Sequence, residues 1–408
     1  MLEFATGDPR SVGLEPGRLQ RIDDAFDAEV QQGRIPGAVV LVARHGKVAY
    51  FKSFGFQDRE KGVPMRTDAI FRIASLTKPI VSTAALMLAE EGKLRITAPV
   101  SQYLPEFNNL KVGVERPGAS GGAELVLEPQ QAEMTIYDLL RHTSGLGDFL
   151  FGTSMVNEAY RAANVAAPNQ TLSELVVKLS KLPLAFHPGT TFEYGMSTVV
   201  LGRIIEVLSG MDLDQFIAER LCKPLGMVDS GFHVTASQVL RVAEPQVDSA
   251  TGSRPPMRDV VNRPKWMSGA GGMVSTAADY ARFCQMFLNH GQLGNVHVLS
   301  PKMVGHMTSN HLPPNTAMSP TVQGLFGSLT PSPAHGQGFG LGFAVRTAVG
   351  LNPLPGSPGE YYWVGSTGTV FWIDPKEGLF AVMLAQALDV LHHYNSLIRN
   401  LVYQSIVN

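Results

Sequence analysis

The sequence predicts an α/β protein of the α+β type, with one antiparallel sheet flanked by an N-terminal and a C-terminal helix and carrying a mainly helical insertion. Two observations carry this prediction. Both ends of the 408-residue chain pair a helical apolar stripe with strand-like apolar runs, whereas the middle shows helical patterns almost throughout. One sheet assembled from the two ends and interrupted by the helical segment is the simplest architecture that accommodates both.

The N-terminal part reads as a helix followed by a hairpin. Apolar residues recur at helical spacing from Leu19 to Val30, and Gly33 follows where a C-cap glycine is expected. The runs AVVLVAR and KVAYFKSFG then flank His45-Gly46, a pair typical of a tight hairpin turn. We therefore expect the chain to open with a helix and two antiparallel strands.

The C-terminal part mirrors this order. The runs YYWVG and TVFWID precede a turn at Pro375–Gly378, and LFAVMLAQ follows as a further strand. A last helical stripe runs from Tyr394 to Ile406. These strands complete the expected sheet.

Between the two ends, helical patterns cover 75–91, 135–142, 171–181, 197–209 and 212–221. The Gly- and Pro-rich stretch RPGASGGAEL interrupts them, and neither an internal repeat nor a flexible linker is evident. We expect residues 1–74 and 262–408 to form the sheet domain and residues 75–261 the helical one.

Composition narrows the class of partner. The net charge is −2, and charged residues make up 17% of the chain without a long run of either sign, which argues against nucleic acid or an anionic membrane as the main partner. The N-terminus lacks the layout of a signal peptide, and no stretch of 18 apolar residues occurs. The sequence as written predicts a soluble cytoplasmic protein, and it leaves the oligomeric state, including a homo-oligomer, open.

No metal site is expected. His392 and His393 are adjacent, whereas helical metal pairs need a spacing of about three or four residues. Cys222 and Cys284 stand alone, and no His-Glu-x-x-His motif occurs.

The stretch Ala74-Ser75-Leu76-Thr77-Lys78 raises the question of chemistry. A serine that opens an apolar helix is usually a cap, because its hydroxyl satisfies an orphan backbone N–H. Ser75 and Lys78, however, share a helical face, and a buried amine can activate a hydroxyl for nucleophilic attack. On this motif alone the cap interpretation is favoured.

The wider context favours chemistry. The segments FRIASLTKPIVSTAALMLAEEGKL, LLRHTSGL, PGTTFEYGMSTVVLGRIIEVLSG and YYWVGSTGTVFWIDPKEGL occur in that order. Together they resemble the serine β-lactamase and penicillin-binding protein superfamily, and most closely the family VIII carboxylesterases related to class C β-lactamases. The resemblance runs from RIPGAVVLVARHGKV to the final helix. It implies a β-lactamase/transpeptidase-like fold with the active site between the sheet and the helical insertion.

The resemblance also implies roles for individual residues. Ser75 matches the acylated nucleophile, Lys78 its activating partner, and Tyr194 the tyrosine of the family's Tyr-x-Asn motif. Ser366 would supply the second oxyanion-hole N–H beside that of Ser75. Because a lysine ammonium nearby favours a phenolate, we expect Lys78 and Tyr194 to titrate as a coupled pair, and which of them accepts the serine proton stays open.

Two positions depart from the lactamase pattern. Met196 replaces the amide of Tyr-x-Asn, and Trp363, in Trp363-Val364-Gly365, replaces the lysine of Lys-Thr-Gly. Trp363, Gly365 and Met196 are expected to contact the substrate. Both replacements remove polar groups and add apolar surface, which favours neutral esters over anionic lactams.

Three further patterns are interpreted as structural. Gly118–Gly122 fits Gly-x-Ser-x-Gly around Ser120, but that motif needs a buried strand before it and a helix after it, whereas KVGVERP precedes and AELVLEP follows, so a flexible surface loop is expected. His142 is expected to be a structural histidine. The glycine-rich stretches 269–272 and 336–342 are expected to form turns that line a cleft.

The sequence therefore predicts a serine hydrolase that cleaves small carboxylic esters without a cofactor, through an acyl-enzyme on Ser75. The alternatives on the same site are a β-lactamase, a D-amino-acid peptidase or amidase, and an acyltransferase. A degenerate peptidoglycan-binding module is the alternative without catalysis, against which the intact Ser75, Lys78 and Tyr194 argue.

Overall fold

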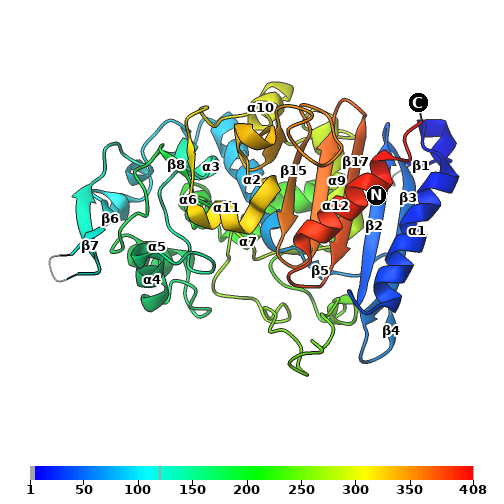
Figure 1. Cartoon of the computed structure of the whole chain (residues 1–408). Coiled ribbons are helices and arrows are strands. Elements are labelled where there is room, and N and C mark those ends of the chain that lie inside the picture. Colours follow the sequence, from blue (N-terminus) through cyan, green and yellow to red (C-terminus); the bar gives the residue numbers. More distant parts are fainter. Residues whose placement is uncertain (1–4, 119–120, 408) are drawn as a thin grey trace.

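The protein is built around one twisted sheet whose strands come from both ends of the chain (Figure 1). The computed structural model describes residues 5–118 and 121–407. In spatial order the strands are β1 (Ala5–Thr6), β3 (Lys47–Asp58), β2 (Gly37–Arg44), β17 (Leu379–Ala385), β16 (Thr369–Asp374), β15 (Tyr361–Gly365), β14 (Ala344–Arg346) and β13 (Gln337–Phe339). β4 (Val63–Pro64) pairs with β3 at one end. The antiparallel β17–β2 ladder joins the two ends of the chain, which confirms the expected sheet.

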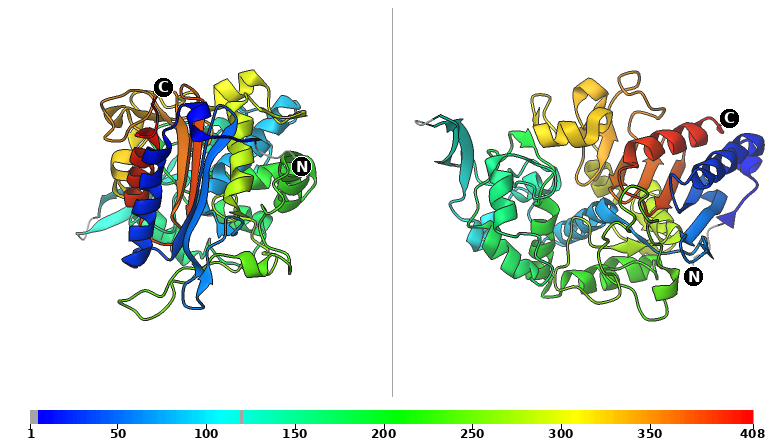
Figure 2. Two further views of the ribbon diagram at one scale, coloured as in Figure 1. Left: turned by 90° about the vertical axis from the view of Figure 1, so that its right-hand side faces the viewer. Right: turned by 60° about the horizontal axis from the view of Figure 1, so that its bottom comes forward.

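Helices cover both faces of this sheet. α1 (Pro16–Gln31) and α12 (Leu391–Tyr403) lie side by side on one face, and α9 (Ala277–Leu288) lies on the other (Figure 2). α1 turns its buried apolar residues towards the sheet and starts at a proline, where the missing N–H costs nothing. The terminal helices are therefore placed as the two apolar stripes predicted.

The first hairpin turns where the sequence indicated. His45 and Gly46, between β2 and β3, both have positive φ values, of 50° and 76°. This is the left-handed pair that a two-residue type I′ turn requires.

The middle of the chain supplies most of the helices. They are α2 (Thr77–Glu90), α3 (Ile136–Leu140), α4 (Met155–Ala162), α5 (Leu172–Leu179), α6 (Ser197–Ser209), α7 (Leu213–Ile217) and α8 (Lys223–Leu225). Capping boxes begin α3 at Thr135 and α5 at Thr171. One expectation was too long, because the helix expected over 135–142 ends at Leu140. The helix expected over 212–221 is instead divided into α7 and a π-helical turn, Ala218–Cys222, and helical structure continues beyond it into α8.

A hairpin that the helical interpretation missed projects from this region (Figure 1). β6 (Lys111–Pro117) pairs antiparallel with β7 (Ala123–Pro129), and Gly118 N–H donates to Gly122 O at 2.9 Å at the tip. Ser120 lies outside the described residues. The Gly-x-Ser-x-Gly pattern is thus flanked by two paired strands and not by a strand and a helix.

The remaining elements are short. They are β5 (Phe71–Arg72) paired with β9 (Val274–Ser275), β8 (Thr191–Phe192) with β12 (Ala317–Met318), β10 (Gln292–Leu293) with β11 (Val296–His297), α10 (Pro301–Met307) and α11 (Pro320–Phe326). A long, mostly irregular segment joins Val242 to β9. Within residues 5–118 and 121–407, no helix combines the length and apolar character needed to cross a bilayer.

Candidate active site

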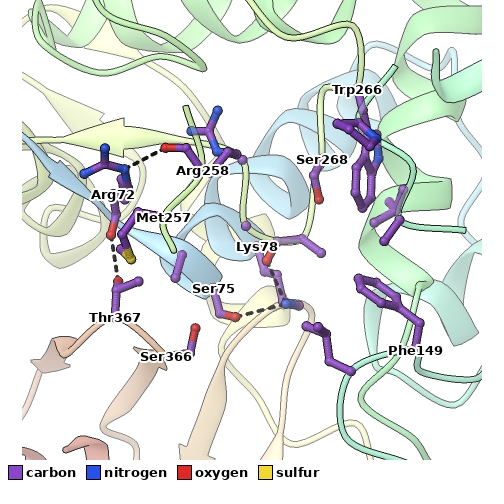
Figure 3. Close-up of a pocket in the computed structure, with 18 of the residues that line it drawn as sticks. Arg72, Ser75, Lys78, Phe149, Met257, Arg258, Trp266, Ser268, Ser366 and Thr367 are labelled. Atoms are coloured by element: carbon purple, nitrogen blue, oxygen red, sulfur yellow. Dashed lines mark hydrogen bonds between the residues drawn. The ribbon is translucent and has the colours of Figure 1, made fainter. Parts of the chain in front are cut away.

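A cavity of about 820 Å³ opens beside the N-terminus of α2. Its walls come from the turn that carries Ser75, the loop after α3, the irregular segment 256–272 and the turn after β15 (Figure 3). Ser75, Lys78, Tyr194, Met196 and Ser366, five of the residues nominated from the sequence, all line it. The structure thus brings together residues that are up to about 290 positions apart in the chain.

Ser75 does not act as a helix cap. It lies within a single 3₁₀ turn, Ala74–Leu76, that leads into α2, and neither this turn nor α2 has a side-chain cap. Ala74 has φ +46°, a left-handed conformation that alanine rarely adopts. The chain therefore holds a strained residue directly before Ser75, whose Oγ faces Lys78 instead of a backbone N–H.

Lys78 is buried beneath Ser75. Its Nζ lies 3.2 Å from Ser75 Oγ, donates to Ala270 O at 2.8 Å and sits 4.1 Å from the centre of the Tyr194 ring. Burial lowers the pKa of Lys78 to about 7, and the nearby carboxyl of Asp148 opposes this only in part. Near neutral pH, a large fraction of this amine is therefore unprotonated and able to accept a proton from a hydroxyl.

Tyr194 is held as a neutral phenol. Burial raises its pKa above the usual value, and this outweighs the hydrogen bonds with Ser75 and Trp363, which act in the opposite direction. The expectation that a Lys78 ammonium would favour the phenolate is wrong for the resting site, because burial disfavours the charged form of both groups.

Trp363 and Gly365 lie behind the cavity wall. Trp363 is 1% exposed, and its indole Nε1 donates to the Tyr194 hydroxyl at 2.8 Å. A Cβ on Gly365 would lie 2.8 Å from Ile73 O and 3.3 Å from Ala74 Cβ, so only glycine lets β15 approach the segment before Ser75 this closely. Neither residue is on the lining of the cavity, and both lie against Tyr194 or the backbone before Ser75. The substrate contacts expected for them stay a prediction.

Two threonines fix the turn after β15 against the same segment. Thr367 Oγ1 donates to Arg72 O at 2.7 Å, and Thr369 Oγ1 donates to Ile73 O at 3.1 Å. Ser366, between β15 and Thr367, is exposed to the cavity. These bonds tie the turn that carries Ser366 to the segment that leads into Ser75.

Arg72 connects this turn to the irregular segment that roofs the cavity. Its guanidinium donates to Ala243 O at 3.1 Å and to Arg258 O at 2.8 Å, and it forms an ion pair with Glu244 at 3.3 Å (Figure 3). Arg72 therefore holds both ends of residues 243–258. The sequence pointed to its neighbours in the Ser75 motif but not to Arg72, because its partners lie 171 or more positions away.

Asp148 organises the opposite wall. Its side chain is buried and accepts the backbone N–H groups of Leu150 at 3.0 Å and Gly152 at 3.3 Å, and that of Phe151. Phe149 and its two successors line the cavity. No motif in the sequence marked this loop as functional, because an aspartate before apolar residues is an ordinary turn signal.

The histidine and the glycine-rich stretches that the sequence assigned to structural roles have no polar contact with Ser75 among the described hydrogen bonds. His142 is fully buried, its pKa is lowered well below the usual value by burial, and its ring packs 5.0 Å from that of Tyr194. Residues 270–272 line the cavity as expected, but residues 336–342 form β13 and its turns and do not. Within the described parts of the chain, no group of three or more His, Cys, Asp or Glu side chains is placed to hold a metal ion.

Comparison with known proteins agrees with this arrangement. The β-lactamase family model matches residues 22–402. Protein Rv1367c of Mycobacterium tuberculosis is 34% identical over 379 residues, which cover 91% of this chain and 89% of its own. Esterase EstB of Burkholderia gladioli is 31% identical over 406 residues, with 93% of each chain covered.

The structural neighbours point the same way. EstCE1, described as a hydrolase with promiscuous acyltransferase activity, superposes with a TM-score of 0.78 at 27% identity and covers 95% of this chain and 99% of its own. These relatives support a serine hydrolase of β-lactamase fold, as the sequence motifs predicted. A family match over nearly the whole chain, together with relatives above 30% identity, shows that the protein is a member of the β-lactamase family.

Proposed function

We propose that the protein is a serine carboxylesterase that acts through an acyl-enzyme on Ser75. The observation that carries the proposal is the contact between Lys78 and Ser75. A buried amine whose pKa is about 7 lies 3.2 Å from a hydroxyl that lines a cavity. A perturbed amine beside a hydroxyl is the arrangement by which a weak serine nucleophile is activated.

In the proposed cycle, Ser75 Oγ attacks the ester carbonyl while its proton passes to neutral Lys78. The oxyanion is stabilised by the backbone N–H groups of Ser75 and Ser366. As the tetrahedral intermediate collapses, the C–O bond to the alcohol breaks, and the proton returns from Lys78 through the Tyr194 hydroxyl to the leaving oxygen. Water then attacks the acyl-enzyme by the same route and releases the acid and free Ser75.

We also propose that the chain divides into a sheet domain and a helical domain. We place the boundary at residues 74/75 and 261/262, which puts the cavity between a sheet domain and a helical domain. Ser366 and Val364 then come from the sheet side, whereas Lys78 and Tyr194 come from the helical side.

A covalent probe tests the proposal directly. A fluorophosphonate should label the intact protein stoichiometrically, and peptide mass spectrometry should place the adduct on Ser75. Ser75→Ala should abolish labelling and ester hydrolysis, whereas Ser120→Ala, in the other serine motif, should leave both within about twofold of wild type. An adduct on Ser120, or unchanged turnover in Ser75→Ala, would overturn the assignment.

Acyl transfer to an alcohol is the second candidate function. EstCE1, whose description names such an activity, is 27% identical to this chain. The largely apolar lining of the cavity would admit an alcohol beside the acyl-enzyme. Adding a short alcohol to the hydrolysis assay separates the two functions, because transfer produces a new ester without a matching release of acid.

A further inference from the structure

We propose that the ester carries a large apolar group on one side of its scissile bond, bound along the loop after α3. This inference rests on the proposed esterase function and specifies the class of substrate. We call the wall concerned the apolar limb, and it consists of Phe149, Leu150, Phe151, Met196, Val199 and Trp266.

The outer end of the apolar limb exposes two large side chains at the mouth of the cavity. Leu150 is 63% exposed and Phe151 is 45% exposed. Single apolar residues on a surface are ordinary, but adjacent ones on the rim of a cavity that leads to a reactive group indicate a binding surface.

This exposure is fixed by hydrogen bonds. Asp148 accepts the N–H groups of residues 150–152, Asn157 Nδ2 donates to Asp148 O, and Arg161 Nη1 donates to Gly152 O at 2.6 Å. A Cβ at Gly152 would lie 2.3 Å from Asn157 Cγ, so the turn is also closely packed. A buried carboxyl therefore holds Leu150 and Phe151 in a preset conformation, which reduces the entropy lost when a ligand covers them.

Charge at this end of the cavity disfavours an anionic ligand. The six residues of the apolar limb carry no charge, and the group at its base is the acidic side chain of Asp148. The Arg263 guanidinium, on the adjoining segment, is engaged by Asp212 at 2.6 Å and Asp214 at 2.7 Å. This cation of the lining is thus already paired, and Arg161 is engaged by Gly152 O within the loop. Lys265, beside Trp266, also lines the cavity, but the limb itself is uncharged and is matched better by an apolar group.

The size of the cavity sets the scale of the ligand. A volume of about 820 Å³ is in the range that encloses a drug-sized molecule, of which an acetyl ester fills only a small part. Each methylene that the limb removes from water should raise kcat/KM about fourfold. The expected substrates therefore carry a large apolar group, such as a medium-length chain.

Two ester series test this inference. One lengthens the acyl group of p-nitrophenyl esters from two to ten carbons, and the other keeps the acetyl group and lengthens the alcohol. In wild type, kcat/KM should rise about fourfold per carbon in at least one series until the limb is filled. The series that rises identifies the side of the ester that the limb binds.

The double variant Leu150→Ala/Phe151→Ala should lower the ratio of kcat/KM for the eight-carbon and two-carbon esters at least tenfold. Leu240→Ala is the matched control, because Leu240 is 88% exposed and lies outside the cavity lining. It should leave the ratio unchanged. Thermal melting confirms that each variant is folded.

Different results would contradict the apolar limb and the esterase function. Flat or falling profiles in both series, or a rising profile that the double variant does not change, would overturn the apolar limb while the esterase survives. A protein that neither reacts with the fluorophosphonate nor hydrolyses any ester would overturn the proposed function itself.

Discussion

The indole Nε1 of Trp363 donates a hydrogen bond to the hydroxyl oxygen of Tyr194 at 2.8 Å. An indole N–H can only donate, so the phenol oxygen accepts this bond and the phenol's own proton must point elsewhere. The same N–H would stabilise negative charge on the phenol oxygen while a proton passes through it. At the position where the lactamases that this chain resembles carry a lysine, the protein thus places an uncharged donor behind the tyrosine.

The variant Trp363→Phe tests this relationship. It keeps an aromatic ring but removes the N–H, so kcat should fall about 10–100-fold, which corresponds to a hydrogen bond to a partly charged oxygen. KM should stay within about threefold, because Trp363 is not on the cavity wall. Steady-state kinetics with one p-nitrophenyl ester give both constants.

Trp372→Phe provides the matched control. Trp372 is buried on the neighbouring strand, and its Nε1 has no hydrogen-bond partner among the described residues. Replacing Trp372 with phenylalanine should change the stability of the protein but not kcat. A Trp363→Phe variant with an unchanged kcat and a raised KM would instead mean that Trp363 contacts the substrate.

The pH dependence of kcat/KM follows from Lys78. Its neutral form accepts the serine proton, so activity should rise about tenfold per pH unit below the Lys78 pKa of about 7 and level off above it. The pKa of Tyr194 is raised, so no descending limb is expected between pH 8 and 9. A bell-shaped profile falling near pH 8 would show that a protonated lysine is needed.

Burial of Lys78 should also affect stability. Its pKa is lower in the folded than in the unfolded chain, so stability rises with pH between about 7 and 10, and the cost of burying the ammonium is fully present below pH 7. Lys78→Met should therefore raise the melting temperature more at pH 6 than at pH 9. Lys93→Met, at an exposed ion pair with Glu91, should show no such pH-dependent gain.

The parts of the fold that sequence patterns predicted are those whose pattern is unbroken. β2 contains the run AVVLVAR and is buried along its whole length, so its type and its place in a hairpin were evident from the sequence, although the order of the strands in the sheet was not. β6 and β7 were missed because KVGVERP and AELVLEP contain Gly, Pro and Glu, which are rare in strands, and because most of their residues remain exposed.

At the site, the sequence nominated Ser75, Lys78 and Tyr194, and the structure brings them into contact. The sequence could not indicate the orientation of the Trp363 indole or the partners of Arg72. These contacts join residues 169 and 171 positions apart, so they leave no local pattern. Burial, which decides the direction of the pKa shifts of Lys78 and Tyr194, is likewise a property of the packed chain.

Arg72 should hold the roof of the cavity in place. Arg72→Ala removes its bonds to Ala243 O, Glu244 and Arg258 O, so limited proteolysis should cut within residues 243–258 at least tenfold faster than in wild type. Arg66→Ala, which removes an exposed ion pair with Asp68, is the control and should not change the cleavage rate. Equal cleavage rates in all three proteins would show that the segment is held by other contacts.

The site should prefer neutral esters to anionic β-lactams by orders of magnitude in kcat/KM. A lactam carboxylate needs a cation, and Arg346, on the sheet strand β14, is buried in an ion pair with Glu360 at 2.9 Å and does not line the cavity. A desolvated carboxylate without a partner costs several kcal/mol, and about 1.4 kcal/mol is tenfold in affinity. Competition between a short p-nitrophenyl ester and a chromogenic cephalosporin measures the preference. Values of kcat/KM within tenfold of each other would contradict this preference. Loss of the cephalosporin activity in Lys265→Ala would then show that Lys265, on the cavity lining, is the cation that binds the lactam carboxylate.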